Sequence, residues 1–308
     1  MSTFPLIDSH QHVFWHGRDD AGLVADMDDL GIERAWLLTW EEASDEPNSA
    51  SLTVLDPRFK VWGGTAAMIP LRTIIDVTRR YPDRFIAGYC PHPLDPQAVP
   101  KLEAAIDIHG VRVCGEWKFT LLIDDPRCIE VFRAAGARGL PVVLHLDVPY
   151  LPPRDGRYVG QNNWKGGGID NLIRALELCP DTTFVGHAPG FWREMAADAD
   201  THPESYLKPP LHPGGRLPGV FDAHPNLYAD LSAGSALRAL KADSNNARDF
   251  IIRYQDRLLF GRDYYGGELL EFLRGLELPD EVWRKVGREN AERLIPEIAP
   301  VPLKKLAG

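Results

Sequence analysis

The sequence has few cysteines and no long apolar segment. Cys90, Cys114, Cys128 and Cys179 stand far apart, and no two of them form a C-x-x-C pair. The small number and wide spacing of the cysteines indicate buried, reduced thiols, so we expect a cytoplasmic protein without disulfides. The N-terminus has no basic region followed by an apolar run, which predicts no signal peptide. No apolar run is long enough to cross a bilayer, which argues against a membrane protein.

Two common nucleotide-binding patterns and a surplus of positive charge are absent as well. There is no G-x-G-x-x-G after the first predicted strand and no G-x-x-x-x-G-K-[ST], so a Rossmann domain and a P-loop lose their main support. The chain has 34 Lys and Arg residues against 44 Asp and Glu residues, a formal net charge of -10. This balance argues against nucleic acid and anionic membranes as partners. We expect a small-molecule substrate and allow for a homo-oligomer.

What the sequence does contain is a regular alternation of short apolar strands and amphipathic helices over 308 residues. We expect an opening strand that includes Leu6 and Ile7, followed by strands at 32–38, 85–90, 110–114, 140–145, 182–187, 227–231 and 257–263. We expect helices at 21–30, 70–81, 97–108, 126–138, 169–179, 247–254 and 281–295. This order implies a parallel sheet covered by helices. About eight strands favour a single domain over residues 1–308, an α/β protein of the closed (β/α)8 TIM-barrel type. An open doubly wound sheet is the alternative.

Two histidines one residue apart, His10 and His12, follow the opening strand. Because side chains alternate along an extended segment, both project to the same side. Two neutral imidazoles on one side supply half of a site for zinc, iron, nickel or manganese. An H-x-H pair alone is weak evidence, since polar residues are common at strand ends.

Three later strands end on residues that also bind metals. His145, His187 and Asp263 close the strands predicted at 140–145, 182–187 and 257–263. The carboxyl ends of barrel strands meet on one face, so these residues would gather around one point with the opening pair. Packing alone does not explain why each apolar run stops on such a residue. The pattern predicts a metal site at the barrel mouth, under long loops that we expect at 147–168 and 188–217.

The segments that carry these residues resemble the amidohydrolase superfamily, in particular its amidohydrolase-related branch of decarboxylases, lactonases and hydratases. The matching segments are IDSHQH at 7–12, LPVVLH at 140–145, FVGH at 184–187, NLYADLS at 226–232, LFGRD at 259–263 and ENAERL at 289–294. They occur in the family's order over nearly the whole chain. Together they are specific for the superfamily and not for one reaction.

The resemblance implies roles for five residues. By position, His10, His12, His145 and Asp263 resemble the ligands of a divalent ion, which we expect to be Zn²⁺, with Mn²⁺, Fe²⁺ or Ni²⁺ as alternatives. His187 resembles an acid or base beside a single ion, or a ligand of a second one. Asp263 would also be the base for a metal-bound water, whose pKa such an ion lowers toward ~7. A histidine that titrates near neutrality can then shuttle the proton.

The strand predicted at 110–114 leads into Glu116 and Lys118, which share a face if the strand continues. Two-metal members of the superfamily place a bridging carboxylated lysine or a glutamate on this strand. Glu116 is therefore a candidate metal bridge, a partner of the ligands or a substrate contact. Lys118 is a candidate site for a substrate carboxylate, and a solvated pair at a strand end is an equal alternative. We expect one ion, and a second through Glu116 stays open.

Four residues after strand ends are candidate substrate contacts: His92, Trp164, Trp192 and Tyr264. Aromatic and basic side chains over a metal suit an anionic or ring-shaped substrate. The same residue types also pack loops against the body of a protein, and a histidine between two prolines, as His92 is, can simply hold a turn.

Three functions follow from these residues. The first is a metal-dependent hydrolase of a small amide, ester or lactone that uses a metal-activated water. The second is a non-oxidative decarboxylase or hydratase of a carboxylated ring or muconate-like acid, in which His187 handles protons. The third is a barrel that has lost its chemistry and only binds. The intact set of candidate ligands argues against the third.

Overall fold

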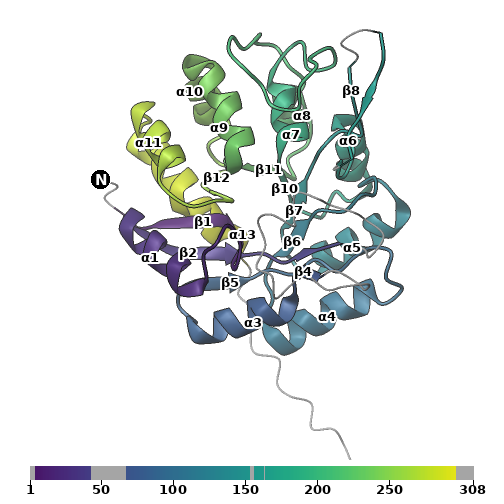
Figure 1. The fold of residues 1–308 in the computed structure, drawn as a ribbon, viewed down its shortest axis with the longest axis vertical. Coiled ribbons are helices and arrows are strands. Elements are labelled where there is room, and N and C mark those ends of the chain that lie inside the picture. Colours follow the sequence, from purple (N-terminus) through teal and green to yellow (C-terminus); the bar gives the residue numbers. More distant parts are fainter. Residues whose placement is uncertain (1–3, 43–66, 153–155, 163, 296–308) are drawn as a thin grey trace, which may run out of the picture.

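Eight parallel strands form the centre of the molecule in the computed structural model, which describes residues 4–42, 67–152, 156–162 and 164–295 (Figure 1). These strands are β1 (Leu6–Gln11), β2 (Ile32–Leu37), β5 (Phe85–Ala87), β6 (Cys114–Trp117), β7 (Val142–His145), β10 (Phe184–His187), β11 (Leu227–Asp230) and β12 (Leu258–Leu259). They pair in parallel in two groups, β1-β2-β5 and β12-β11-β10-β7-β6. The helices lie around the outside of the strands (Figure 1).

Backbone hydrogen bonds connect the two groups of strands at both seams. Between β5 and β6, Gly88 pairs with Val113, and the Tyr89 N–H donates to the Val113 carbonyl at 2.9 Å. Between β12 and β1, the Ser9 N–H donates to the Phe260 carbonyl at 2.9 Å. The strands thus follow one another in chain order around a barrel, which confirms the predicted fold class over the open doubly wound sheet.

The interior of the barrel has a hydrophobic core of its own. Its buried side chains come from strands of both groups: Ile7, Trp36, Leu38, Ile86, Val113, Val143, Val185 and Leu259. Ala291, Leu294 and Ile295, near the C-terminal end of the described chain, pack against this inner core. A larger core fills the space between strands and helices. Apolar side chains from both groups of strands meet in one cluster, as expected for the packed interior of a barrel.

Helices form close to the predicted positions. The helices in question are α1 (Asp20–Leu30), α3 (Leu71–Arg80), α4 (Ala98–His109), α5 (Pro126–Ala137), α6 (Ile169–Leu178) and α10 (Ser244–Arg253). The Asp19 carboxylate caps α1 by accepting from the Gly22 N–H, and Gly31, with a φ of 73°, ends it. Asp125 caps α5, with Pro126 in its first turn. These are ordinary start and stop signals, which is why the sequence located these helices well.

Elsewhere the elements differ from the prediction. The strand expected at 110–114 lies at Cys114–Trp117, so Glu116 is inside β6. The segment expected as a strand at 257–263 is a strand only at Leu258–Leu259. After Leu259 the backbone forms hydrogen bonds with β1. The predicted C-terminal helix is divided into α12 (Asp280–Arg284), a π-helical segment (Lys285–Glu289) and α13 (Asn290–Leu294).

Several elements were not predicted. Additional helices are α7 (Pro189–Trp192), a 3-10 turn (Arg193–Met195), α8 (Leu217–Ala223), α9 (Ala233–Ala242) and α11 (Glu268–Gly275). The predicted loop at 147–168 contains a short hairpin, β8 (Tyr150–Leu151) with β9 (Val159–Gly160). A second short pair consists of β3 (Trp40–Glu41) and β4 (Ala67–Ile69), which are antiparallel.

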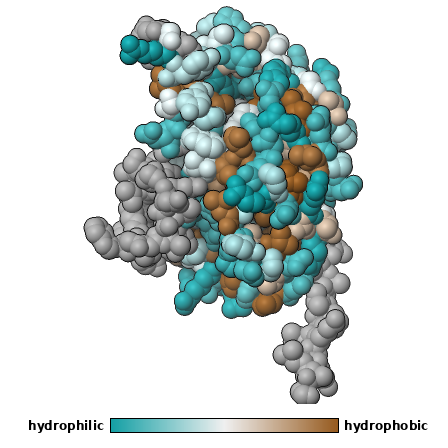
Figure 2. Space-filling view, turned by 90° about the vertical axis from the view of Figure 1, so that its right-hand side faces the viewer, coloured by the Kyte–Doolittle hydropathy of each residue, from teal (hydrophilic) through white to brown (hydrophobic). Residues whose placement is uncertain are grey.

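The surface mixes hydrophilic and hydrophobic side chains. Figure 2 shows one side face, on which brown apolar areas stand among teal hydrophilic ones. The most exposed large apolar side chains are Tyr158 at 74% and Ile108 at 71%. Scattered apolar residues of this kind are normal on a protein surface. Among the described residues, no helix has both the length and the apolar character that a membrane span requires.

Candidate metal centre

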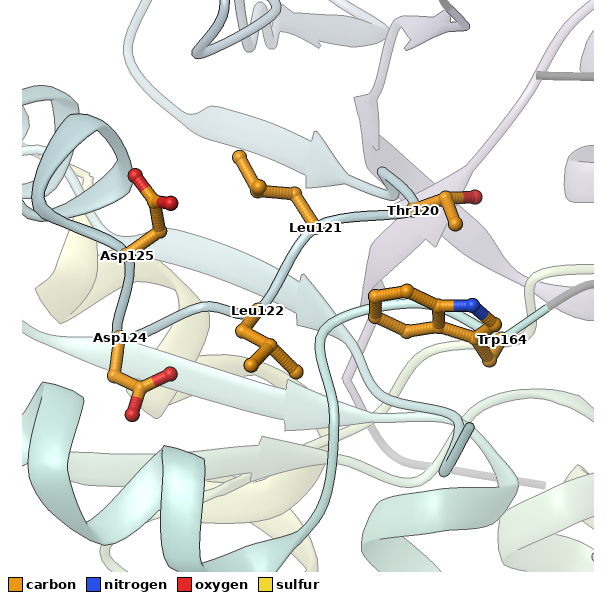
Figure 3. Close-up of a pocket in the computed structure, with 6 residues that line it drawn as sticks. All are labelled: Thr120, Leu121, Leu122, Asp124, Asp125 and Trp164. Atoms are coloured by element: carbon orange, nitrogen blue, oxygen red, sulfur yellow. The ribbon is translucent and has the colours of Figure 1, made fainter. Parts of the chain in front are cut away.

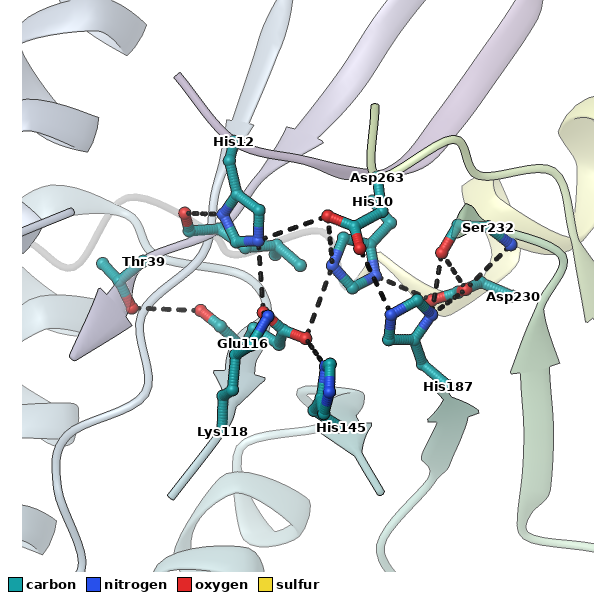
Figure 4. Close-up of polar contacts among 12 residues, drawn as sticks. His10, His12, Thr39, Glu116, Lys118, His145, His187, Asp230, Ser232 and Asp263 are labelled. Carbon is teal, nitrogen blue, oxygen red and sulfur yellow. Dashed lines mark hydrogen bonds and ion pairs between the residues drawn. The ribbon is translucent and has the colours of Figure 1, made fainter. Parts of the chain in front are cut away.

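β1 places His10 and His12 side by side, with their ring centroids 5.4 Å apart. His12 Nδ1 lies 3.0 Å from the Leu38 carbonyl oxygen, and His10 Nδ1 lies 2.9 Å from Asp230 Oδ2. Because a carbonyl or carboxylate oxygen only accepts, each Nδ1 must carry the proton. Each Nε2 atom therefore carries the lone pair that can bind a cation, and the two atoms face one common space (Figure 4). Contacts of this kind fix metal-binding histidines in many proteins.

Asp263 faces the two histidines from the loop after β12. Its φ of 48° lies in the left-handed region, which aspartate tolerates better than most residues. Its N–H donates to the His10 carbonyl at 2.9 Å. One carboxylate oxygen, Oδ1, lies 3.6 Å from Nε2 of both His10 and His12. Burial alone would raise the pKa of Asp263, but the surrounding histidines, His10 first, lower it to about 2.

Glu116 enters the same space from β6. Its Oε2 lies 3.1 Å from His12 Nε2, and its Oε1 lies 2.8 Å from His145 Nδ1 and 3.8 Å from His10 Nε2. The ammonium of Lys118 lies 3.4 Å from Oε2. Burial would raise the pKa of Glu116, but Lys118 and the histidines hold it well below its usual range. The carboxylate is therefore charged and central to the cluster.

His187, at the end of β10, completes the group. Its Nε2 lies 3.3 Å from Asp263 Oδ2. Its Nδ1 contacts Asp230 Oδ1 at 3.0 Å and the Ser232 hydroxyl at 2.8 Å. Burial would lower the pKa of His187, but the charge of Asp230 and its hydrogen bond raise it to about 10. The structure thus brings the histidine predicted as acid or base into contact with the predicted base.

His145 stands at the edge of the cluster. Its Nδ1 contacts Glu116, and its Nε2 lies 3.1 Å from Asp147 Oδ2. Its ring centroid lies 5.3 Å from that of His187. Both ring nitrogens therefore face carboxylates in this arrangement. His145 belongs to the same constellation, and its role as a direct ligand stays a prediction.

The residues present fit a divalent cation. Two groups of three have ligand atoms within 4.8 Å of one another: His10, His12 and Asp263, and His10, Glu116 and His187. Two of these atoms, His10 Nε2 and Asp263 Oδ1, are buried without a hydrogen-bond partner among the described residues. Buried polar atoms are normally paired, so a cation between them would satisfy both. Imidazole and carboxylate ligands suit zinc, manganese, iron or nickel.

Asp230 is the residue whose importance the sequence did not reveal. One of its carboxylate oxygens contacts His10 and the other contacts His187. It is fully buried, and the charges of the two histidines lower its pKa against the effect of burial. Its position in the NLYADLS segment was the available signal. A sequence alone does not show which two rings a carboxylate will bridge.

We expect Asp230→Asn to weaken metal binding or turnover by about 10- to 100-fold. Asparagine keeps the shape, but its single carbonyl oxygen can accept from only one of the two Nδ1–H groups. The other imidazole then loses its fixed tautomer and orientation. Metal titration of the purified variant checks this, with Ser232→Ala as the control that removes the hydroxyl contacts to His187 and Asp230 but keeps the Asp230 carboxylate. Equal affinities for wild type and Asp230→Asn would contradict the assignment.

Lys118 and Trp40 form the basic and aromatic part of the site. The Lys118 ammonium lies 4.2 Å from the centroid of the Trp40 ring, and its side chain is 12% exposed. Burial would lower the pKa of Lys118, but Glu116 first and Asp263 next raise it. A charged, nearly buried ammonium beside an aromatic face can receive a planar anion.

The other predicted substrate contacts are placed differently. The His92 Nδ1 accepts from the Leu94 N–H at 3.1 Å, as a turn residue does, while its ring centroid lies 4.4 Å from that of Phe119. The side chain of Tyr264 is 50% exposed, and its ring lies 4.8 Å from that of His16. Neither contact tests a role in substrate binding, which stays a prediction for both.

Trp164 and Trp192 have surroundings of different kinds, and for Trp164 a role as a substrate contact stays a prediction. Trp164 lines a pocket of about 360 Å³ together with Thr120, Leu121, Leu122, Asp124 and Asp125, as Figure 3 shows. None of these side chains is a predicted ligand. Trp192 is 1% exposed and its ring packs 6.2 Å from that of Phe250. The structure gives Trp192 a packing role between α7 and α10, and its role as a substrate contact stays a prediction.

Glu194, in the loop after β10, is a buried acid that the sequence did not single out. It is 3% exposed, and its Oε2 has no hydrogen-bond partner among the described residues. Burial raises its pKa to about 7, with Asp200 adding to the effect. Because the folded state then holds this proton more tightly than the unfolded chain, stability falls as the pH rises from the ordinary glutamate value to 7 and stays low above it.

We therefore expect Glu194→Gln to be more stable than wild type at pH 8 and close to it at pH 5. Each pKa unit corresponds to ~1.4 kcal/mol, so the gain at pH 8 can reach about 3 kcal/mol. Thermal unfolding at several pH values checks this, with the exposed Glu130 changed to Gln as the control. The assignment fails if the stability difference between Glu194→Gln and wild type does not change with pH.

The structure thus places four histidines, two charged carboxylates and a lysine at the strand ends of an α/β barrel, and these ligand types suit a divalent cation. The model of the Amidohydrolase family matches residues 7–296, and the chain therefore belongs to this family. No protein of curated function matches it in sequence.

Solved structures of the same fold include both lyases and a hydrolase. An uncharacterized TIM-barrel protein from Bordetella bronchiseptica matches with a TM-score of 0.58 and 20% identity, over 89% of this chain and 81% of that one. A probable 2-pyrone-4,6-dicarboxylic acid hydrolase from Acinetobacter baumannii, with citric acid bound, has a TM-score of 0.57 and 12% identity over 96% and 99%.

A dihydroxybenzoic acid decarboxylase from Polaromonas sp. JS666, with bound manganese and an inhibitor, has a TM-score of 0.54 and 17% identity over 95% and 97%. At such identities the likeness shows the fold. It does not decide between hydrolysis and decarboxylation.

Proposed function

We propose that the protein is a metal-dependent hydrolase of a small lactone, ester or amide, with its reaction centre at the mouth of the barrel. The observation that carries the proposal is the position of Asp263. One of its carboxylate oxygens is buried, lacks a hydrogen-bond partner among the described residues and lies 3.6 Å from Nε2 of His10 and of His12. A base directly beside a two-histidine cation site is the arrangement that activation of water requires.

The cation would be held by His10, His12 and Asp263, with Glu116 within reach of both histidines. A divalent ion at this point supplies an acidified water and polarises a substrate carbonyl. We propose one ion, because the Lys118 ammonium already lies 3.4 Å from Glu116 and balances its charge. A second ion at His10, Glu116 and His187 would have to compete with this ammonium. We expect zinc, with manganese, iron or nickel as alternatives.

The residues around the cation have complementary proton roles. Asp263 would take the proton from the attacking water, and its Oδ2 lies 3.3 Å from His187 Nε2. His187 is held by Asp230 in the orientation that directs Nε2 into the site. Its raised pKa makes it a proton donor, so it can protonate the leaving oxygen or nitrogen. Lys118 is placed to bind a carboxylate of the substrate.

A second candidate is decarboxylation of a carboxylated ring, and Lys118 is the observation that favours it. An ammonium next to an indole face, 4.2 Å from the Trp40 centroid, suits a flat acid whose carboxylate faces the cation. The dihydroxybenzoic acid decarboxylase among the solved structures acts on such an acid. In this reaction His187 would deliver the proton that replaces the carboxylate.

The experiment starts from purified protein that is treated with a chelator and then reloaded with Zn²⁺ or Mn²⁺. Lactones, esters and amides are tested in ¹⁸O-labelled water, and carboxylated phenols are tested for release of CO₂. We expect metal-restored turnover of a lactone, ester or amide with ¹⁸O in the product. Release of CO₂ without label would favour the second candidate, and turnover that no metal changes would overturn both.

Metal content provides the matched control. His12→Gln should lose the ion, whereas His212→Gln, which changes an exposed histidine, should retain it. Equal metal content in the two variants would place the cation elsewhere.

A further inference from the structure

A second cavity lies at the end of the barrel opposite the metal centre, where the strands begin. It has a volume of about 330 Å³ and lies between the last turns of α3 and α4 and the starts of β2, β5 and β6. Phe85, Ile86 and Pro82 form its apolar part. The size falls within the range of small-ligand pockets, which is roughly 300–1,000 Å³. None of its lining residues takes part in the metal centre.

Four basic residues line this cavity, and no acidic residue does: Arg34, Arg79, His109 and Arg112. This local excess of positive charge contrasts with the net charge of the whole chain, which is -10. Neighbouring arginines of the same region are paired, as Arg84 is with Asp28 at 2.8 Å and Arg72 with Asp76 at 3.9 Å. The three arginine side chains of the cavity, by contrast, form no ion pair with any residue that the structure describes.

Arg34 and Arg112 are the most informative members of this group. Arg79 and His109 lie in the last turns of α3 and α4, where cations are common because they offset the helix dipole. Arg34 lies within β2 and Arg112 just before β6, so neither has that explanation. The Nε of Arg34 is buried and has no hydrogen-bond partner among the described residues. Because buried polar atoms are normally paired, the described residues leave the hydrogen-bonding capacity of this guanidinium partly unfilled.

We propose that this basic cavity binds a small organic dianion with an apolar body. The guanidinium groups of Arg34 and Arg112 would take the anionic groups, since arginine matches phosphate and carboxylate oxygens with two parallel N–H donors. Phe85, Ile86 and Pro82 would contact the apolar body. The site is separate from the metal centre and does not depend on the proposed reaction.

Titration calorimetry at low ionic strength tests the proposal with phenyl phosphate and phthalate as probes. Both are dianions on a benzene ring, so the pair distinguishes a phosphate from a dicarboxylate ligand, and benzamide serves as the neutral control. Arg34→Gln and Arg112→Gln should each weaken binding by about tenfold or more, since a hydrogen bond to a charged group is lost. Added salt should also weaken it. Arg72→Gln, on the same helix as Arg79 but with a side chain 91% exposed, should bind like wild type.

Each result of this titration either supports or overturns the proposed anion site. Binding of either dianion that both variants weaken, with benzamide inactive and metal-dependent turnover unchanged, supports the site. Absence of binding by both dianions to wild type overturns it. Binding that survives in both arginine variants also overturns it, because the probe then sits elsewhere, for example at the metal centre. Arg112→Gln changes a half-buried residue that lies outside the strands, and it keeps the test valid if Arg34→Gln fails to fold.

Discussion

Replacing Asp263 with asparagine is expected to lower turnover by about 10³-fold or more without unfolding the protein. The amide has nearly the same shape as the carboxylate but carries no charge and cannot accept the proton of the attacking water. In the structure the carboxylate oxygen Oδ1 is 3.6 Å from Nε2 of both His10 and His12, and Oδ2 is 3.3 Å from His187. One substitution therefore removes a base, a candidate ligand and the partner of the proton donor. Steady-state kinetics with excess metal measure the loss.

His187→Asn is the matched comparison, because it removes the proton donor and leaves Asp263 in place. With a single ion at His10, His12 and Asp263, this variant should lose turnover and keep its metal. If it instead loses an ion, the group formed by His10, Glu116 and His187 holds a second one. The Asp263 assignment itself is contradicted if the asparagine variant keeps turnover within about tenfold of wild type.

The constellation was predictable because strand ends in a barrel converge. His10, His145 and His187 each follow an apolar run, and the parallel ladder sets β7 and β10 in register, so that His145 pairs with His187. Sequence spacing alone therefore placed three strand ends on one face. Glu116 was harder to place, since β6 begins later than its apolar residues suggest. Its central position is known only from the structure.

The features that could not be predicted from the sequence depend on contacts between segments that lie far apart in the chain. Asp230 bridges His10 and His187, which lie 220 and 43 residues away from it in the chain. Trp192 looked like a mouth residue by position, yet it packs against Phe250 of α10. Helices α8 and α9 were also missed, because the short α8 contains a proline and a glycine and α9 begins with the small residues Ala-Gly-Ser, which read as loop signals. Local patterns carry no information on such pairings.

Arg262 connects the metal centre to the wall of the barrel. Its Nε donates to Asp8 Oδ2 at 2.7 Å, and its Nη1 pairs with Asp26 of α1. Asp8 also accepts from the His10 N–H at 3.2 Å. Arg262 is 4% exposed, and its neighbour in the chain is Asp263. The buried ion pairs thus join β1, α1 and the loop that carries Asp263 at the seam between β12 and β1.

Arg262→Met is therefore expected to lower the free energy of unfolding by about 3–5 kcal/mol. Methionine fills much of the volume but leaves Asp8 buried without its counterion and leaves Asp26 with only the more exposed Arg18, 2.9 Å away. Burial would raise the pKa of Asp26, and Arg262 is the first group that lowers it, so this carboxylate depends directly on the guanidinium. For a chain of this size, each kcal/mol lowers the melting temperature by roughly 2–4 °C. Chemical and thermal unfolding of the variant measure the loss.

An exposed ion pair provides the reference for the loss of stability expected in Arg262→Met. Arg284→Met removes an exposed arginine, 53% accessible, whose Nε lies 3.4 Å from Glu289, and such pairs contribute only about 0–1 kcal/mol. The double variant Arg262→Met with Asp26→Asn should recover part of the stability, because it removes one of the two carboxylates that Arg262 balances. If Arg262→Met costs no more than Arg284→Met, the buried network does not hold the seam. In that case the position of Asp263 must depend mainly on its own backbone hydrogen bond to His10.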